Sequence, residues 1–173
     1  MRPDQRLAQS VTMSLPSEEE WFNLPAALLF ETGTIRLREH STADISELVA
    51  RLTRGNYSKP FVIDDGVFRR LHFGLGTVQS GMGIVAPYAL KFAYTRKMMA
   101  FLLFVPQPKH VIIVGLGGGS LTKVCYRQLP RTRVTTVEFD CDVIEFGKLF
   151  HVPNSDTRMR IVHADAFDYF ATT

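Results

Sequence analysis

The sequence has little cysteine and no long apolar run. Two cysteines occur among 173 residues, Cys125 and Cys141, and they show neither a disulfide framework nor the CxxC spacing of a metal site. This usage favours reduced packing residues and a cytoplasmic location. The longest apolar helical stretch, Met98 to Val105, is too short to span a bilayer. The N-terminus, MRPDQRLAQS, lacks the apolar segment of a signal peptide. We therefore expect no membrane insertion and no bound metal.

Charge of either sign is also modest, and no basic run is present. The net charge is +3, and the basic residues do not alternate with aromatic ones along the chain. This pattern excludes an obvious nucleic-acid surface, and scattered arginines such as Arg36 and Arg38 are expected on solvated faces. The hydrophobic content of 46% is that of a globular chain with room for one ordinary domain, or for one and a half small ones.

The stretch from His110 to Asp140 organises the chain. The β-branched run 111–114 predicts a strand that is buried on both faces, as in parallel sheets. A glycine-rich loop follows, then a helical pattern over 121–129 that ends before Pro130. A second apolar strand, 134–137, carries an acid at its end. Strand, glycine loop, helix, strand and acid form the layout of a nucleoside-binding βαβ unit.

The glycine loop and the acid are the candidate binding elements. Glycine lets a ligand approach the main chain, and the helix that follows presents free N–H groups. Glu138 lies 138 − 115 = 23 positions after Gly115, a spacing that suits a carboxylate accepting hydrogen bonds from two ribose hydroxyls. The alternative is a simple tight turn followed by a solvated strand end. The complete βαβ context favours ligand binding. The GxGGGS loop resembles the S-adenosylmethionine-binding Rossmann-like fold more than the NAD fold.

The pattern predicts an α/β protein, in which a small antiparallel β module precedes a partial Rossmann-like parallel sheet. Residues 1–59 are expected to form a lead and a helix, and 60–86 a β-hairpin module with a turn at Asp65-Gly66. Residues 87–173 are expected to form the partial nucleoside-binding domain. Its third strand is predicted at Ile161-Val162, just before Asp165.

Three further segments complete this interpretation. Residues 1–20 are polar and are expected to form a flexible lead, and Trp21 to Phe30 to pack as a short segment onto the body. A helix through 45–52 is expected to begin at a Ser41-Thr42 cap. Another is expected to run from Pro87 to Phe104.

Together these residues resemble the polyamine aminopropyltransferase family, spermidine synthase and its relatives. The resemblance covers Pro60 to Phe170 and rests on FVIDDGVFRRLHFGLGTVQSGM, AYTRKMMAFLLF, VIIVGLGGGS, VEFD and HADAFDYF. It implies decarboxylated S-adenosylmethionine or S-adenosylmethionine as the co-substrate, without a metal. It also implies aminopropyl transfer to a polyamine.

The resemblance implies roles for two groups of residues. The donor group is Gly115, Gly117, Gly118, Gly119, Ser120, Glu138, Phe139, Asp165 and Ala166. The acceptor group is Gln79 and Tyr94, which line the polyamine channel in this reading.

Within the donor group, the loop lies against the nucleoside and its sulfonium chain, and Glu138 holds the ribose. Phe139 lies near the adenine, and Asp165 with Ala166 reads the adenine edge. From the residues alone, other readings stay open. Gln79 fits an exposed strand, Tyr94 fits a helix core, and Asp165 fits a helix cap.

The sequence departs from the family pattern in two places. Ser120 stands where the family usually carries an aspartate in GGGD, which leaves the donor open between the decarboxylated and intact forms. Arg96 and Lys97 follow Tyr94 where the family reads YHEM or YQEM, and cations facing the cleft would repel putrescine. The family's catalytic aspartate follows a fourth strand, which would begin beyond Thr173, so we expect the general base to be absent from this chain.

We therefore expect a spermidine synthase-like protein that binds the donor but is inactive as a single chain. A methyltransferase that uses S-adenosylmethionine and a non-catalytic nucleoside-binding relative stay open. Whether residue 173 is a natural end also stays open. In the doubly wound order the strand at 111–114 is central, so its second edge would seek another strand. The expected cover is another copy, the segment from Trp21 to Phe30, or a companion polypeptide that supplies a C-terminal half.

Overall fold

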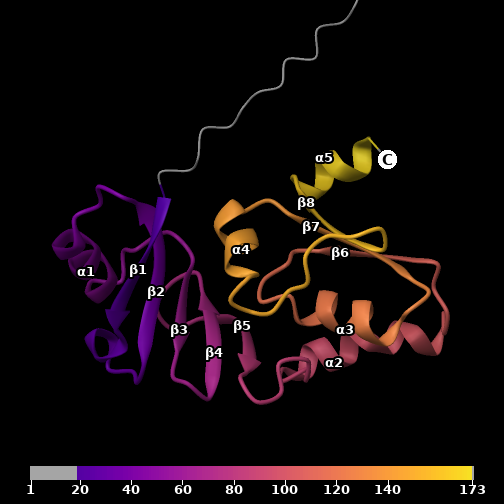
Figure 1. Ribbon diagram of the computed structural model, residues 1–173, viewed down its shortest axis with the longest axis horizontal. Coiled ribbons are helices and arrows are strands. Elements are labelled where there is room, and N and C mark those ends of the chain that lie inside the picture. Colours follow the sequence, from indigo (N-terminus) through magenta and orange to yellow (C-terminus); the bar gives the residue numbers. More distant parts are fainter. Residues whose placement is uncertain (1–18, 173) are drawn as a thin grey trace, which may run out of the picture.

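The computed structural model describes residues 19–172 and contains two sheets packed side by side (Figure 1). One is antiparallel with five strands, and the other is parallel with three. The predicted α/β class, with an antiparallel module before a Rossmann-like sheet, is confirmed. Most of the predicted N-terminal lead lies outside the described residues. Within 19–172, no helix has the length and apolar character needed to cross a membrane.

The antiparallel sheet is larger than the hairpin module expected over 60–86. In spatial order its strands are β1 (Glu19–Pro25), β2 (Thr34–His40), β3 (Phe61–Asp64), β4 (Phe68–His72) and β5 (Val78–Gly83). Strands β2 and β3 pair with Ile35 opposite Ile63, so the sheet crosses the expected boundary at residue 59. The segment from Trp21 to Phe30 forms β1 and the 3-10 helix η1 (Ala26–Leu29). It does pack onto the body, but as an edge strand.

Two helices begin at residues other than those predicted. The first is α1 (Ile45–Thr53), whose cap is Asp44; Oδ1 of this residue accepts a hydrogen bond of 2.7 Å from the Ser46 N–H. The second is α2 (Ala93–Met98), which continues as the 3-10 helix η2 (Met99–Leu103). The predicted start at Pro87 is wrong, because residues 86–89 form a turn closed by the Ala89 N–H and the Ala86 carbonyl.

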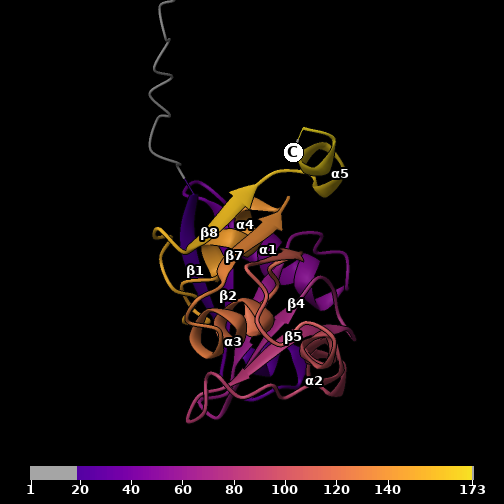
Figure 2. The same cartoon turned by 90° about the vertical axis from the view of Figure 1, so that its right-hand side faces the viewer.

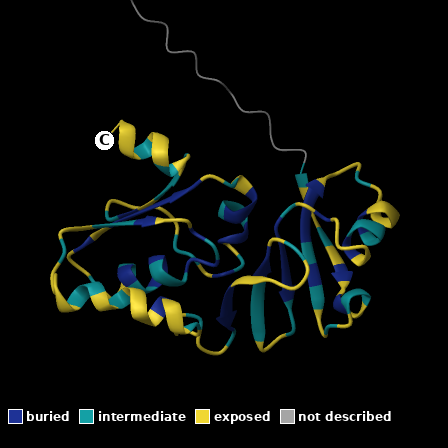
Figure 3. Cartoon of the chain, turned by 180° about the vertical axis from the view of Figure 1, so that it is seen from behind, coloured by how far each residue is buried: buried dark blue, intermediate teal, exposed yellow. Residues whose placement is uncertain are grey.

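The parallel sheet follows the prediction closely. Its strands are β6 (His110–Val114), β7 (Arg133–Glu138) and β8 (Met159–His163), in that order. The helices between and after them are α3 (Ser120–Gln128), α4 (Cys141–Phe146) and α5 (Ala166–Ala171). One face packs on α3 through Ile113, Cys125, Val134 and Met159. Helix α5 projects from the end of β8 (Figures 1 and 2). It is largely exposed (Figure 3).

Strand β6 lies at an edge of this sheet. Its bonds to β7 include the Gly115 N–H to the Val137 carbonyl and the Arg133 N–H to the Lys109 carbonyl. Because peptide groups alternate sides along a strand, those of His110, Ile112 and Val114 point to the other edge. No strand within residues 19–172 pairs there. The segment from Trp21 to Phe30 pairs with β2 instead, which removes one of the three covers considered for β6.

The two sheets share one apolar core. Val62, Leu71 and Met82 of the antiparallel sheet pack with Leu116 of the glycine loop and with Phe146 and Phe150 at α4. Figure 1 shows α4 between the sheets, and the Trp21 ring lies 5.3 Å from that of Phe146. This packing fixes the glycine loop against β5.

Lys123 is buried in this junction. It lies on α3 with 1% of its surface exposed, and its Nζ donates to the Phe150 carbonyl at 2.7 Å. The Met82 sulfur lies 3.2 Å from the same nitrogen. Burial, and secondarily the charge of Arg69, lower the pKa of the Lys123 amine to about 8. Keeping the Lys123 amine protonated therefore destabilises the folded state at neutral pH.

Raising the pH from about 8 to 10.5 should stabilise the wild-type chain relative to Lys123→Met. In this window the unfolded chain keeps a proton that the folded chain has released, and stability rises wherever the unfolded state binds more protons. One pH unit of such a difference is worth about 1.4 kcal/mol, so the whole window adds roughly 3 kcal/mol. Urea unfolding of both proteins across this range measures the effect. Parallel stability profiles would contradict the assignment.

Candidate functional site

A cavity of about 440 Å³ lies between β5, α2 and the carboxyl ends of β6 and β7. Its walls come from both sheets, so the shared core also sets its shape. The lining residues are Phe73, Gln79, Ser80, Tyr94, Thr95, Met98, Ile113, Val114, Gly115, Leu116, Gly117, Ser120, Leu121, Val137, Glu138, Phe139, Ala164 and Ala166. A cavity at the carboxyl ends of parallel strands is where nucleosides bind in open α/β sheets.

The structure brings most of the sequence-predicted residues to this cavity. The lining includes Gln79, Tyr94, Gly115, Gly117, Ser120, Glu138, Phe139 and Ala166. Three predicted residues, Gly118, Gly119 and Asp165, lie outside the lining.

The first two loop glycines border the cavity in left-handed backbone conformations. Gly115 has φ of 84° and Gly117 has φ of 52°, a region that disfavours side chains. A Cβ added to Gly115 would meet nothing within 4 Å, so its backbone is open to a ligand. The open space beside the Gly115 main chain would let a nucleoside approach the backbone closely.

The last two loop glycines serve packing instead. A Cβ on Gly118 would lie 2.9 Å from the Phe150 ring, and one on Gly119 would lie 2.3 Å from Cγ2 of Val152. Both glycines are buried against the segment that follows α4. These packing contacts hold the loop in place. The contact of the two residues with a nucleoside stays a prediction.

Glu138 is a buried carboxylate on the cavity wall, with 6% of its surface exposed. Oε2 accepts a hydrogen bond of 2.8 Å from the Leu116 N–H, and Oε1 accepts one of 3.0 Å from the Asp140 N–H. Each oxygen keeps further acceptor capacity, because an ionised carboxylate offers about four lone-pair sites. The residue thus braces the glycine loop and can also accept from hydroxyl groups.

Phe139 and Asp165 lie at the rim. The Phe139 side chain is exposed and lines the cavity, and its carbonyl lies 2.9 Å from Nε2 of His163. It offers an apolar face to a flat ring. Asp165 caps α5 by accepting a 2.7 Å bond from the Phe167 N–H. The capping role that the sequence left open for Asp165 is thus present.

The cavity wall formed by β5 and α2 is lined by uncharged residues. The Tyr94 hydroxyl donates to the Gln79 carbonyl at 3.3 Å, which ties α2 to β5. Arg96 turns away and donates to the carbonyls of Leu90 at 2.9 Å and Lys91 at 3.0 Å. Neither Arg96 nor Lys97 lines the cavity, so the expected repulsion of a cationic acceptor does not arise there.

Sequence reasoning missed several residues of the lining. Ser80 and Thr95 add hydroxyls, and Phe73, Met98 and Leu121 add apolar surface. Alternation along β5 would have placed Gln79 and Ser80 on opposite faces. Both line the cavity, beside an irregular pairing of β4 and β5 at Leu71 and His72. No group of three or more histidine, cysteine or acidic residues in the described part of the chain is placed to hold a metal.

Comparisons with known proteins agree with this geometry. No protein-family model matches the chain. Over 121 residues the chain is 36% identical to the polyamine aminopropyltransferase of Neisseria meningitidis serogroup A, covering 69% of this chain and 46% of that protein. The chain belongs to the polyamine aminopropyltransferase family. The family predicted from the motifs is thus confirmed. The matched region spans less than half the length of that relative.

Two further matches bear on this family member. A solved spermidine synthase in complex with the transition-state analogue AdoDATO superposes with a TM-score of 0.50 and 22% identity. The superposition covers 70% of this chain and 43% of that one, and it shows the shared fold. The eEF1A lysine and N-terminal methyltransferase homolog of Drosophila melanogaster is 36% identical over 61 residues, which is 35% of this chain and 9% of that protein.

Proposed function

We propose that the cavity binds an adenosyl nucleoside with a sulfonium or thioether at its 5′ carbon. The observation that carries this proposal is Glu138, a buried carboxylate at the end of β7 beside the open backbone of Gly115. A carboxylate in this place accepts hydrogen bonds from both ribose hydroxyls. Phe139 supplies a face for the adenine. The AdoDATO complex of the solved spermidine synthase supports this class of ligand.

For the whole protein we propose aminopropyl transfer to a polyamine. An amine nitrogen attacks the carbon beside the sulfonium, the carbon–sulfur bond breaks, and the thioether leaves. The attacking amine must lose a proton to a base. Among the described residues, Glu138 is the one carboxylate in the cavity lining, and both of its oxygens accept backbone N–H groups. We assign it to ribose binding, and among residues 19–172 no second acid lines the cavity to serve as the base.

Purified residues 1–173 should transfer no detectable aminopropyl group to putrescine. The assay is the release of methylthioadenosine from decarboxylated S-adenosylmethionine, with binding of methylthioadenosine as the control for an intact site. The free edge of β6 motivates a second proposal, that the chain associates with another copy or a companion polypeptide. Turnover by a chain shown to be monomeric by sedimentation would contradict both proposals.

Replacing Glu138 with alanine should weaken methylthioadenosine binding by about 1–3 kcal/mol, the worth of charge-assisted hydrogen bonds. The loss has two sources: the ribose contacts and the brace on the Leu116 N–H. Calorimetry measures it, with Glu145→Ala as the control, because Glu145 lies on α4 outside the cavity and pairs with Lys148. Equal affinity in the Glu138 and Glu145 variants would remove the assignment.

Methyl transfer from S-adenosylmethionine is the second candidate. The match to the Drosophila melanogaster methyltransferase homolog favours it, as does the uncharged Ser120 on the cavity wall. The two reactions leave different thioethers: aminopropyl transfer yields methylthioadenosine, and methyl transfer yields S-adenosylhomocysteine. Identifying the product formed by the whole protein therefore separates them.

A further inference from the structure

A second cavity, of about 220 Å³, lies in the antiparallel half of the molecule. It is bordered by η1, the end of α1 and the loop that joins β4 to β5, and we call it the η1 cavity. It shares no lining residue with the cavity assigned to the nucleoside. Its apolar wall consists of Leu28, Leu29, Phe30, Ile63 and Leu75. The η1 cavity therefore favours a largely apolar occupant.

The polar part of this lining is the buried imidazole of His72. Only 6% of the residue is exposed, and its ring stacks on that of Phe61, with centroids 5.1 Å apart. Burial, and secondarily the charge of Arg70, lower the pKa of His72, so the ring is neutral at pH 7. A hydrogen bond to the Gly74 backbone raises that pKa, which means that one ring nitrogen donates there. The other nitrogen, Nε2, is buried without a partner among the described residues. In the neutral ring Nε2 is then an acceptor, and an O–H or N–H group of a ligand would satisfy it.

The charge at the edge of the η1 cavity is already matched. Glu31 lines the cavity, and its Oε2 lies 3.1 Å from Nη2 of Arg70. A cationic ligand would compete with Arg70 for this carboxylate, and an anionic ligand would be repelled by it. Together with the neutral imidazole, this pair favours a ligand without net charge.

Two exposed apolar side chains complete the lining. Phe30 has φ of 58°, a left-handed conformation that is unusual for a bulky residue, and its side chain is fully exposed. Such backbone outliers cluster at ligand-binding positions. Leu75 is exposed between Gly74 and Gly76, and a Cβ added to either glycine would meet nothing within 4 Å. Leu75 is thus free to move aside and admit a ligand to His72, while the Phe30 ring offers a face to a flat molecule.

We propose that the η1 cavity is a second binding site, for a small neutral aromatic compound that carries one O–H or N–H donor, as phenols and indoles do. The ring of the compound packs against the leucines and Phe30, and its donor bonds to Nε2 of His72. The volume lies below the range of drug-sized ligands and suits a single ring or two fused rings. The inference does not depend on the proposed function, because the two cavities have separate linings.

The test compares indole with benzothiophene, in which sulfur replaces the N–H group. An NMR titration of isotope-labelled residues 1–173 should show saturable shifts at the His72 and Leu75 amides. Indole should bind about fivefold more tightly than benzothiophene, the effect of one neutral hydrogen bond. His72→Phe keeps an aromatic ring and should remove this preference. Phe30→Gly, which suits the left-handed backbone, should weaken the binding of both compounds several-fold. Phe104→Ala, at an exposed phenylalanine outside the η1 cavity, is the matched control and should change neither affinity.

The outcomes decide the assignment. Equal binding of the two compounds by the wild-type chain overturns it, as do shifts that never saturate or shifts confined to Gly115 and Glu138 of the other cavity. If His72→Phe does not fold, as circular dichroism would show, the wild-type preference and the Phe30→Gly variant settle the question. An unchanged indole affinity in Phe30→Gly contradicts the site. Loss of methylthioadenosine binding would bear on the proposed function alone, because that ligand is assigned to the other cavity.

Discussion

Replacing Asp142 with alanine should destabilise the folded chain by about 3 kcal/mol, the lower end of the cost of breaking a buried ion pair. Asp142 lies in the first turn of α4 with 7% of its surface exposed. Its Oδ1 accepts a 2.7 Å hydrogen bond from Nη1 of Arg38 on β2. Removing the carboxylate would leave the buried guanidinium of Arg38 with one acidic partner fewer.

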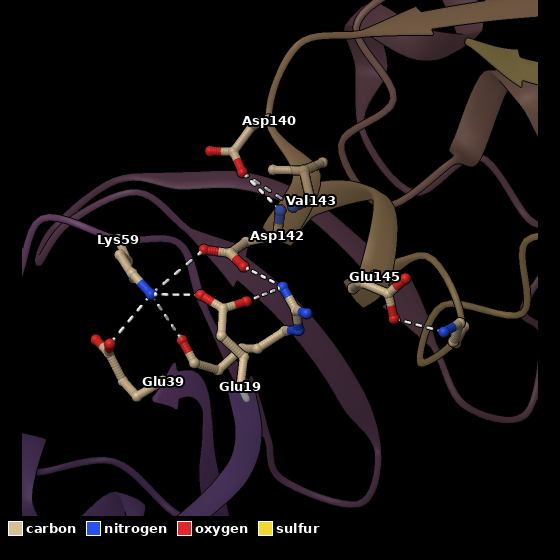
Figure 4. A network of polar contacts seen from close by, with 9 residues as sticks. Glu19, Glu39, Lys59, Asp140, Asp142, Val143 and Glu145 are labelled. Atoms are coloured by element: carbon tan, nitrogen blue, oxygen red, sulfur yellow. Dashed lines mark hydrogen bonds and ion pairs between the residues drawn. The ribbon is translucent and has the colours of Figure 1, made fainter. Parts of the chain in front are cut away.

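This pair belongs to a network that joins the two sheets (Figure 4). Nζ of Lys59 lies 3.1 Å from Oε2 of Glu39, 3.2 Å from Oε1 of Glu19 and 3.9 Å from Oδ2 of Asp142. Burial raises the pKa of the Asp142 carboxyl despite the opposing hydrogen bond from Arg38. The intact pair thus adds little net stability, whereas the loss of one partner is costly.

Urea unfolding followed by tryptophan fluorescence measures the effect. Trp21 is the single tryptophan of the sequence and packs beside Phe146 on α4, so it reports on this interface. Glu145→Ala is the matched control on the same helix, since its partner Lys148 is exposed, and it should change stability by less than about 0.5 kcal/mol. Equal small losses in both variants would show that the network does not hold the sheets together.

Replacing Gly119 with alanine should cost about 3 kcal/mol and abolish nucleoside binding. Left-handed backbone strain costs roughly 1–2 kcal/mol for a residue with a Cβ. Overpacking against Val152, 2.3 Å from the added Cβ, adds roughly 1–3 kcal/mol. Because Gly119 precedes α3, relief of the clash would also move Ser120 and the cavity wall.

Gly66→Ala separates strain from packing. Gly66 has φ of 83° in the β3–β4 turn, and nothing lies within 4 Å of its added Cβ, so this variant carries the strain alone. Urea unfolding of the two variants should therefore differ by about 1–3 kcal/mol, the overpacking cost. If Gly119→Ala is no less stable than Gly66→Ala, the packing role of Gly119 is wrong.

The parallel half of the fold was predictable because its signals are local. The β-branched run of β6 and the glycine loop mark their elements without reference to distant residues. In β2, Ile35 and Leu37 alternate with charged residues, a local strand signal that the predicted elements do not include. The sequence predicts Arg38 in solvent, whereas the residue is buried and donates a hydrogen bond to Asp142, 104 positions away. No local pattern reveals a partner at that distance.

The residues of the candidate site likewise fall into those that local sequence predicts and those that depend on distant contacts. The first two loop glycines and Glu138 follow from spacing along one βαβ unit, and they line the cavity. The packing role of Gly118 depends on Phe150 and Ser80, which approach it from other elements. No sequence motif marks Ser80, because this residue reaches the cavity wall only through the packing of β5 against the glycine loop. Arg96 turns away from the cavity because it donates to carbonyls in the segment before α2. The sequence predicts that segment as part of a helix, so this orientation does not follow from it.

A crystal structure of the chain with methylthioadenosine tests the nucleoside assignment most directly. The account predicts the ligand in the cavity, with its ribose hydroxyls within hydrogen-bond distance of the Glu138 oxygens and its adenine on Phe139. The 5′ thioether should lie against Gly115. A ligand bound elsewhere, or a cavity that stays empty at a concentration that saturates binding in solution, would contradict the account.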